Sequence, residues 1–84
     1  MPKHVAFVAG ATGFTGREVV RLLRERGIDT HAHVRPDSAR LAHWRAQFEP
    51  LGAKVDTTPW RSATMITSLH RIRPTLVFGL LGTT

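Results

Sequence analysis

The chain has 84 residues and no cysteine, and 12 lysine and arginine residues against six aspartate and glutamate residues give it a formal charge of +6. This length allows one small domain and excludes a cofactor domain joined to a second, substrate-binding domain. The absence of cysteine excludes a disulfide framework and a thiolate metal site. The first apolar run is too short for a signal peptide or a membrane span, so we expect a cytoplasmic protein.

The excess of basic residues is compatible with a nucleic-acid partner or with an anionic cofactor. These residues are scattered along the chain, and the arginines of segment 17–26 alternate with Glu18 and Glu25. Such mixing is typical of a solvated helix face. We therefore expect an anionic small molecule as the partner, with no nucleic acid and no membrane.

The most informative stretch runs from Val5 to Gly16 and is typical of an apolar strand, a glycine-rich turn and a helix start. Glycines recur at every third position, at Gly10, Gly13 and Gly16. Glycine permits dihedral angles that a β-carbon forbids and lets a ligand approach closely. A helix starting there presents N–H groups and a positive dipole end, which suit a phosphate. The pattern predicts a dinucleotide pyrophosphate site, although the glycine spacing differs from the commonest fingerprint.

The rest of the chain alternates between helical and strand patterns. We expect strands at 4–9, 30–34, 53–58 and 75–81. We expect helices from 12 or 13 to 26, from a cap at Asp37 or Ser38 to Pro50, and from a cap at Ser62 or Thr64 to Pro74. The third helix should bury positions 65, 69 and 72. The unbroken apolar run 76–81 should be buried on both faces, whereas the polar third strand suits a sheet edge.

These elements predict an α/β fold with a Rossmann-like parallel sheet in the order 3-2-1-4, helices on both faces, and the extent of half a doubly wound domain. The chain direction reverses between the first and fourth strands, where the segments 10–16 and 82–84 should meet. The fourth strand would be an apolar edge that invites pairing. We expect either a further strand of a longer protein or self-association through 75–81.

The turn Gly10-Ala-Thr-Gly-Phe-Thr-Gly16 resembles that of short-chain dehydrogenase/reductases, above all their extended and atypical, NmrA-like branches that bind NAD(P)H. Val34-Arg35-Pro36 and Leu81-Gly82-Thr83-Thr84 support the resemblance, which thereby spans the chain. The resemblance implies the N-terminal part of a dinucleotide-binding domain, with no second domain in 1–84. The expected cofactor-binding residues are Gly10, Thr12, Gly13, Phe14, Thr15, Gly16, Arg35, Ser38, Gly82 and Thr83.

The end of the second strand distinguishes the two nicotinamide cofactors. An acidic residue there binds the ribose hydroxyls of NAD, whereas a guanidinium meets the 2′-phosphate of NADP with paired hydrogen bonds. Arg35 has this position and favours NADP(H), with Ser38 and Arg40 as candidates to assist. Asp29 lies at a suitable sequence distance but precedes the strand, so NAD is the weaker alternative.

Two further residues concern the adenine end of the cofactor. In the family an acidic residue after the third strand often reaches the adenine, and Asp56 is a poor match because the aligned position lies nearer Trp60. Trp44 has the spacing of a core residue and is expected to pack on the sheet, with a base-stacking role as the alternative.

Catalysis in this family commonly uses a tyrosine and a lysine four residues later, and the chain contains no tyrosine. We therefore assign no catalytic residue and expect the NADP(H)-binding half of an oxidoreductase. A non-catalytic redox sensor of NmrA-like type and a truncated fragment without independent activity are the alternatives. His31 and His33 share a strand face, but no third ligand is evident and we expect no metal site.

Overall fold

The structure is a computed structural model and describes residues 4–79. Its elements are β1 (Val5–Ala9), α1 (Phe14–Glu25), β2 (Asp29–His33), α2 (Leu41–Phe48), the 3₁₀ turn η1 (Glu49–Leu51), β3 (Lys54–Asp56), α3 (Ser62–Ile72) and β4 (Leu76–Gly79). All strand pairs are parallel, and the order in the sheet is β3-β2-β1-β4. The predicted α/β fold and strand order are confirmed.

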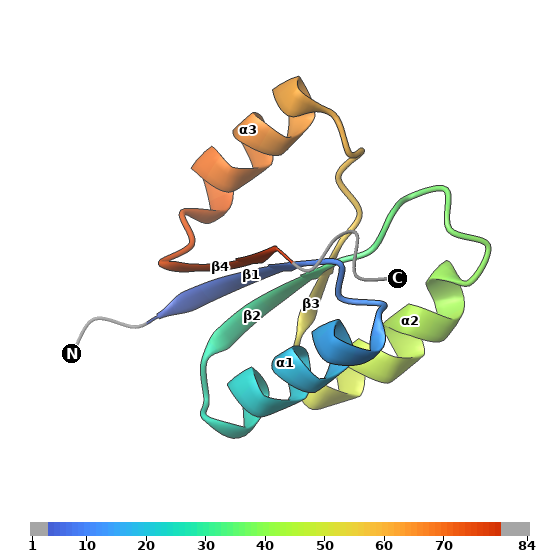
Figure 1. The fold of residues 1–84 in the computed structure, drawn as a ribbon, viewed down its shortest axis with the longest axis vertical. Coiled ribbons are helices and arrows are strands. Elements are labelled where there is room, and N and C mark those ends of the chain that lie inside the picture. Colours follow the sequence, from blue (N-terminus) through green and yellow to red (C-terminus); the bar gives the residue numbers. More distant parts are fainter. Residues whose placement is uncertain (1–3, 80–84) are drawn as a thin grey trace.

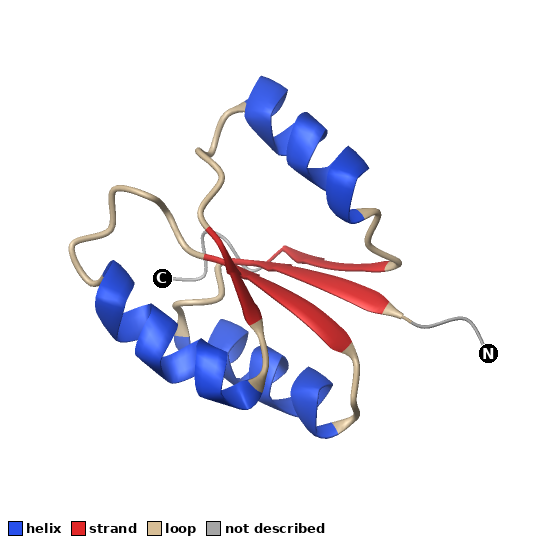
Figure 2. Cartoon of the chain, turned by 180° about the vertical axis from the view of Figure 1, so that it is seen from behind, coloured by secondary structure: helices blue, strands red, loops and turns tan. Residues whose placement is uncertain are grey.

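Helices cover both faces of the sheet, as predicted. In Figure 1, α1 and α2 lie on one side of the strands and α3 lies on the other, and the reverse view gives the same layers (Figure 2). The right-handed crossover rule explains this arrangement. The chain steps in one direction from β1 to β3 and then returns past β1 to β4, so the last crossover helix must take the opposite face. No helix within residues 4–79 is long and apolar enough to cross a membrane.

The hydrophobic core lies between the sheet and the layer formed by α1 and α2. Side chains alternate between the faces of a strand, so Ala6 and Val8 of β1 point into this layer. Trp44 and Phe48 of α2 stack there with 6.0 Å between ring centroids, which confirms the expectation that Trp44 packs in the core. The buried members of the core are Ala6, Val8, Ala11, Val20, Leu23, Ala32, Val34, Trp44, Phe48 and Ala53.

The central strand β1 pairs with β2 on one side and with β4 on the other. Val8 pairs with Ala32 of β2 and with Phe78 of β4. Before β4 begins, the Thr75 backbone N–H donates to the Val5 carbonyl at 2.8 Å, and the Thr75 hydroxyl accepts from the Val5 N–H at 3.0 Å. These bonds set the register in which β4 joins the sheet.

The burial of β4 differs from the expectation. Leu76 and Phe78 are half-buried against the core, whereas Val77 and Gly79 point to the other face and are exposed. Val77 is 61% exposed. The prediction of burial on both faces is therefore wrong for these residues, because β4 is an edge strand and α3 does not cover Val77. Residues 80 and 81 lie outside the described segment, and self-association through this edge stays a prediction.

The helix starts also differ from the expected caps. The residue before α2 is Arg40, whose backbone N–H donates to the Ser38 hydroxyl at 3.2 Å, so neither Asp37 nor Ser38 caps the helix. α2 ends at Phe48, and the chain continues into η1 because proline is tolerated in the first turn of a helix.

α3 follows Arg61, and neither Ser62 nor Thr64 is its cap; the Thr64 hydroxyl donates to the Pro59 carbonyl at 2.7 Å. Within α3 the fully buried residue is Ser68, whereas positions 65, 69 and 72 are only half-buried. The predicted positions therefore lie on the less exposed face of α3, but only Ser68 on that face is fully buried.

Candidate functional site

The glycine-rich turn joins β1 to α1. Gly10 has a φ of +78°, in the left-handed region that glycine adopts without strain. Its carbonyl accepts a hydrogen bond from the Gly13 N–H at 3.2 Å, which closes the turn. A β-carbon on Gly16 would collide with the Gly10 carbonyl oxygen and lie 2.7 Å from the Ala11 Cα. Gly10 and Gly16 thus allow α1 to begin directly against the end of β1.

The start of α1 is open to solvent. Gly13 is the N-cap residue, no side chain caps the helix, and its first turn has no acidic residue. A β-carbon on Gly13 would meet the Gly10 oxygen at 3.6 Å, an ordinary contact. The first N–H groups of a helix have no partner inside it. Together with the positive end of the helix dipole, they make this turn suitable for an anion.

A cavity of about 430 Å³ lies beside the turn and is lined by Gly10, Thr12, His33, Arg35 and Trp60. These residues come from the end of β1, the end of β2 and the loop that follows β3. The carboxyl ends of parallel strands meet at one edge of a sheet, and ligands of open α/β sheets bind at that edge. None of the lining residues is acidic. The cavity brings together three of the predicted site residues, namely Gly10, Thr12 and Arg35.

Arg35 follows β2 by two residues, and its side chain is 73% exposed. Its Nη2 donates to Asp37 Oδ2 at 3.1 Å. An exposed ion pair of this kind contributes about 0–1 kcal/mol. Because a guanidinium has five N–H donors, one bond to Asp37 leaves most of its donor capacity for an anion.

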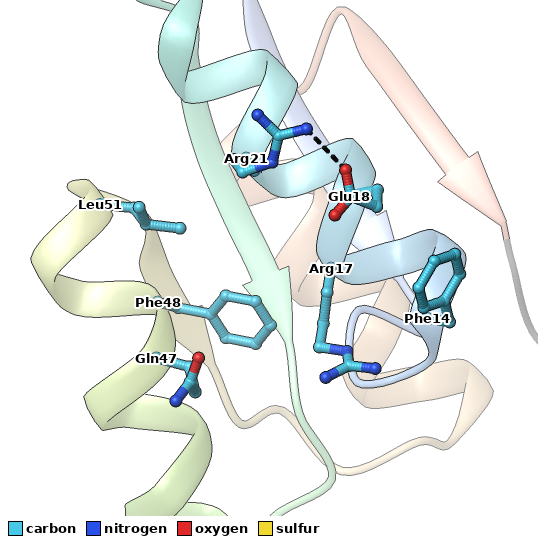
Figure 3. A pocket seen from close by; sticks show the side chains of 7 residues that line it. All are labelled: Phe14, Arg17, Glu18, Arg21, Gln47, Phe48 and Leu51. Carbon is cyan, nitrogen blue, oxygen red and sulfur yellow. Dashed lines mark hydrogen bonds and ion pairs between the residues drawn. The ribbon is translucent and has the colours of Figure 1, made fainter.

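Phe14 lies in a different place from the other predicted site residues. It is 75% exposed and lines a cavity of about 330 Å³ between α1 and α2. Figure 3 shows Arg17 reaching into this groove from α1 while Phe48 points across it from α2. The Arg17 guanidinium lies 6.0 Å from the Phe14 ring and 5.8 Å from the Trp44 ring. This groove lies between α1 and α2 and shares no lining residue with the cavity beside Gly10.

The remaining predicted residues do not line the cavity. Gly13 is exposed at the end of the turn and Thr15 is exposed in the first turn of α1. The Ser38 hydroxyl accepts a hydrogen bond from the Arg40 backbone N–H. Gly82 and Thr83 lie outside the described residues. Their assignment to the cofactor site stays a prediction.

His33 and Trp60 line the cavity, although neither was among the predicted site residues. His33 is 3% exposed, with Nε2 2.8 Å from the Thr58 carbonyl oxygen. Its ring centroid lies 5.1 Å from that of Trp60, which is 49% exposed. The sequence signal that points to Trp60 is its place shortly after β3, at the same edge of the sheet as the glycine turn.

Asp56 is buried at the end of β3 and does not line the cavity. Its Oδ1 accepts from the Thr58 backbone N–H at 2.8 Å, and its Oδ2 accepts from the Ser68 hydroxyl at 3.1 Å. Burial raises the pKa of Asp56, but the hydrogen bonds from Thr58 and Ser68 outweigh this and hold the pKa below its ordinary value. The carboxylate therefore ties β3 to α3.

His31 and His33 lie on the sheet face that α3 covers. Burial lowers the pKa of His31 below its ordinary value, although the nearby Asp29 carboxylate opposes this shift. Among residues 4–79, no three side chains of the metal-binding types gather as a group that would hold a metal ion.

No protein-family model and no curated protein matches this chain. A solved structure does match, titled a "putative epimerase" from Burkholderia cenocepacia J2315, with 31% sequence identity and a TM-score of 0.72. The chain has a Rossmann-like fold. The match covers 94% of the present chain and 25% of the Burkholderia chain, so the present chain spans about a quarter of that protein's length.

Proposed function

We propose that this chain is the NADP(H)-binding half of an oxidoreductase of the short-chain dehydrogenase/reductase type, with the cofactor pyrophosphate on the turn from Gly10 to Gly16. One observation carries the proposal: a single cavity is lined by Gly10 and Thr12 of the turn and by Arg35 after β2. In dinucleotide sites the glycine-rich turn contacts the pyrophosphate, and the residue at the end of the second strand contacts the adenosine ribose.

The chemistry of the lining residues fits this cofactor. The uncapped start of α1 offers N–H donors to the pyrophosphate. Arg35 offers a planar set of donors to a 2′-phosphate. No lining residue carries a carboxylate that would repel either phosphate. When a phosphate binds, the Arg35 guanidinium would either keep its contact with Asp37 or exchange it for the phosphate. Losing this contact would cost little free energy, because the ion pair is exposed.

In this proposal the chain binds and orients the cofactor. When bound, the nicotinamide would supply or accept a hydride, and Gly82 and Thr83 are proposed to lie beside that half. The 84 residues contain no tyrosine, so the tyrosine proton donor of related reductases is not among them. We propose that the chain corresponds to the N-terminal part of a larger dinucleotide-binding domain. The same lack of tyrosine favours, as a second candidate, an NmrA-like redox sensor that holds the cofactor without turning it over.

The test is a comparison of dissociation constants for NADPH and NADH by calorimetry. We expect the wild-type chain to bind NADPH more tightly, and Arg35→Ala to weaken NADPH binding about 10- to 100-fold, the range for hydrogen bonds to a charged group, with little effect on NADH. Arg26→Ala is the matched control, because it removes the same charge from the far end of α1, about 18 Å away along the helix.

Two outcomes would contradict the proposal. Equal affinities for NADPH and NADH in both the wild-type and the Arg35→Ala protein would remove the assignment of Arg35 and of NADP. A lack of saturable binding of either dinucleotide to the folded chain would remove the cofactor site itself.

A further inference from the structure

The loop that follows β3 is fixed by hydrogen bonds on both sides of Trp60. The Thr58 N–H donates to Asp56 Oδ1 at 2.8 Å, and the Thr58 carbonyl pairs with His33 Nε2, also at 2.8 Å. The Pro59 carbonyl accepts from the Arg61 N–H at 2.8 Å and from the Thr64 hydroxyl at 2.7 Å. Trp60 therefore lies on a segment that hydrogen bonds tie to β2, β3 and α3.

The indole of Trp60 has support on one side and an open cavity on another. His33 packs at 5.1 Å between centroids with a 53° angle between the rings. Phe7 lies behind His33 at 6.0 Å. About half of the Trp60 surface, 49%, stays exposed, and the residue lines the cavity that holds Gly10, Thr12 and Arg35. A large, rigid aromatic surface thus faces the same space as the anion-binding groups.

The polar groups near this wall are largely committed to other contacts. Both oxygens of Asp56 accept hydrogen bonds from Thr58 and Ser68, and the side chain is only 5% exposed. His33 uses Nε2 for the Thr58 carbonyl. Within residues 4–79, the part of the cavity next to His33 therefore offers an aromatic face, and neither Asp56 nor His33 Nε2 is free to read the hydrogen-bonding edge of a base.

We propose that Trp60 is the stacking wall for the adenine base of the dinucleotide, and that the site recognises this base by its flat face and not by its polar edge. The inference rests on the cofactor site proposed above and adds the residue that would hold its base. Stacking on an aromatic side chain tolerates different bases because every base has a π-face. The site should consequently accept purines whose edge has been altered.

The test uses the full chain and four probes: NADP⁺, NAD⁺, the etheno-adenine analogue of NADP⁺, and nicotinamide mononucleotide. The etheno bridge blocks the edge of the base and keeps its face, so we expect it to bind the wild type within about threefold of NADP⁺. Trp60→Leu should weaken NADP⁺, NAD⁺ and the etheno analogue by one common factor of about 5 to 150, and should leave the mononucleotide unchanged. Trp60→Phe should retain most of the affinity.

The outcomes separate this inference from the cofactor site. If Arg35→Ala weakens NADP⁺ while Trp60→Leu changes nothing, the stacking wall is wrong and the cofactor site stands. If the etheno analogue binds far more weakly than NADP⁺, recognition by the face is wrong. If the wild type binds no dinucleotide, both proposals fall.

A measurement without mutation covers the case in which Trp60→Leu does not fold. Of the two tryptophans, Trp44 is 8% exposed and Trp60 is 49% exposed, so acrylamide should quench mainly the fluorescence of Trp60. Saturating NADP⁺ should protect this fluorescence from acrylamide. Unchanged quenching at saturation would overturn the inference.

Discussion

The two faces of the sheet are built by different means. The face under α1 and α2 is a closed apolar layer in which Ala6, Val8 and Val20 have no exposed surface. The face under α3 contains a cleft of about 440 Å³, and the buried residue that α3 contributes is the polar Ser68. The cleft is lined by Phe7, Ala9, Trp60, Arg61, Ser62, Met65, Leu69, Val77 and Gly79.

The two faces of the sheet should therefore contribute to the stability of the fold in different ways. Apolar burial is the dominant favourable term in folding, so the α1 and α2 layer should supply most of the stability. The α3 side is held by the hydrogen bonds among Asp56, Thr58 and Ser68, which act at a few points and depend on charge. Mutations on the two faces should therefore have effects of different size and different pH dependence.

The largest effect is expected for Gly16→Ala, at the junction of the closed layer and the glycine turn. Its new β-carbon would meet the backbone of Gly10 and Ala11, which cannot move without displacing α1 from β1. We expect a loss of about 3 kcal/mol or more in the free energy of unfolding, measured by urea denaturation. Gly13→Ala is the control within the same turn, since its β-carbon has room, and it should lose less than about 1 kcal/mol. Similar losses in both variants would contradict the packing role of Gly16.

A matched pair of valines compares the faces directly. Val8→Ala removes two methyl groups from a fully buried position of β1, and we expect a loss of about 2 kcal/mol. Val77→Ala makes the same change in the neighbouring strand at a position that is 61% exposed, and should change stability by less than about 0.5 kcal/mol. A large loss in Val77→Ala would show that the α3 face is covered in solution.

A loss smaller than that of Val8→Ala is expected for Asp56→Asn, and it should depend on pH. The pKa of Asp56 lies below its ordinary value of 3.8, so the ionised carboxylate stabilises the fold above that pH and its contribution is lost as the pH falls through the folded-state pKa. At neutral pH the variant should be about 1–2 kcal/mol less stable. Denaturation curves at neutral and acidic pH would measure the difference in unfolding free energy between the wild type and the variant, which should become smaller in acid. A difference that does not change with pH would contradict the role of this carboxylate.

The sequence was sufficient to predict the fold, because each helix and strand carries its own periodicity and the crossover rule leaves one simple sheet order. The turn and Arg35 could be placed at one edge for the same reason. Burial was harder to predict. The apolar pattern of 76–81 does not reveal that β4 is half-covered, since burial depends on what packs above Val77.

The position of Trp60 in the cavity is a second feature that could not be predicted from the sequence. Its place in the cavity depends on the bond between His33 and the Thr58 carbonyl, which joins residues 25 positions apart in the chain. The burial of Ser68 in α3 is a similar case, since it accompanies a hydrogen bond to Asp56, twelve positions earlier in the chain. Polar contacts between distant residues leave no periodic pattern that could be recognised in advance.

The pairing of β4 with the central strand has a kinetic consequence. Thr75 and Val5 are 70 positions apart, and this contact closes nearly the whole chain into a loop whose entropy opposes folding until β4 is in place. During synthesis on the ribosome, one side of β1 would stay unpaired until residues 75–79 emerged. The closed layer of α1 and α2 consists of earlier segments and is able to form first, so the sheet is expected to be completed late and by its most distant contact.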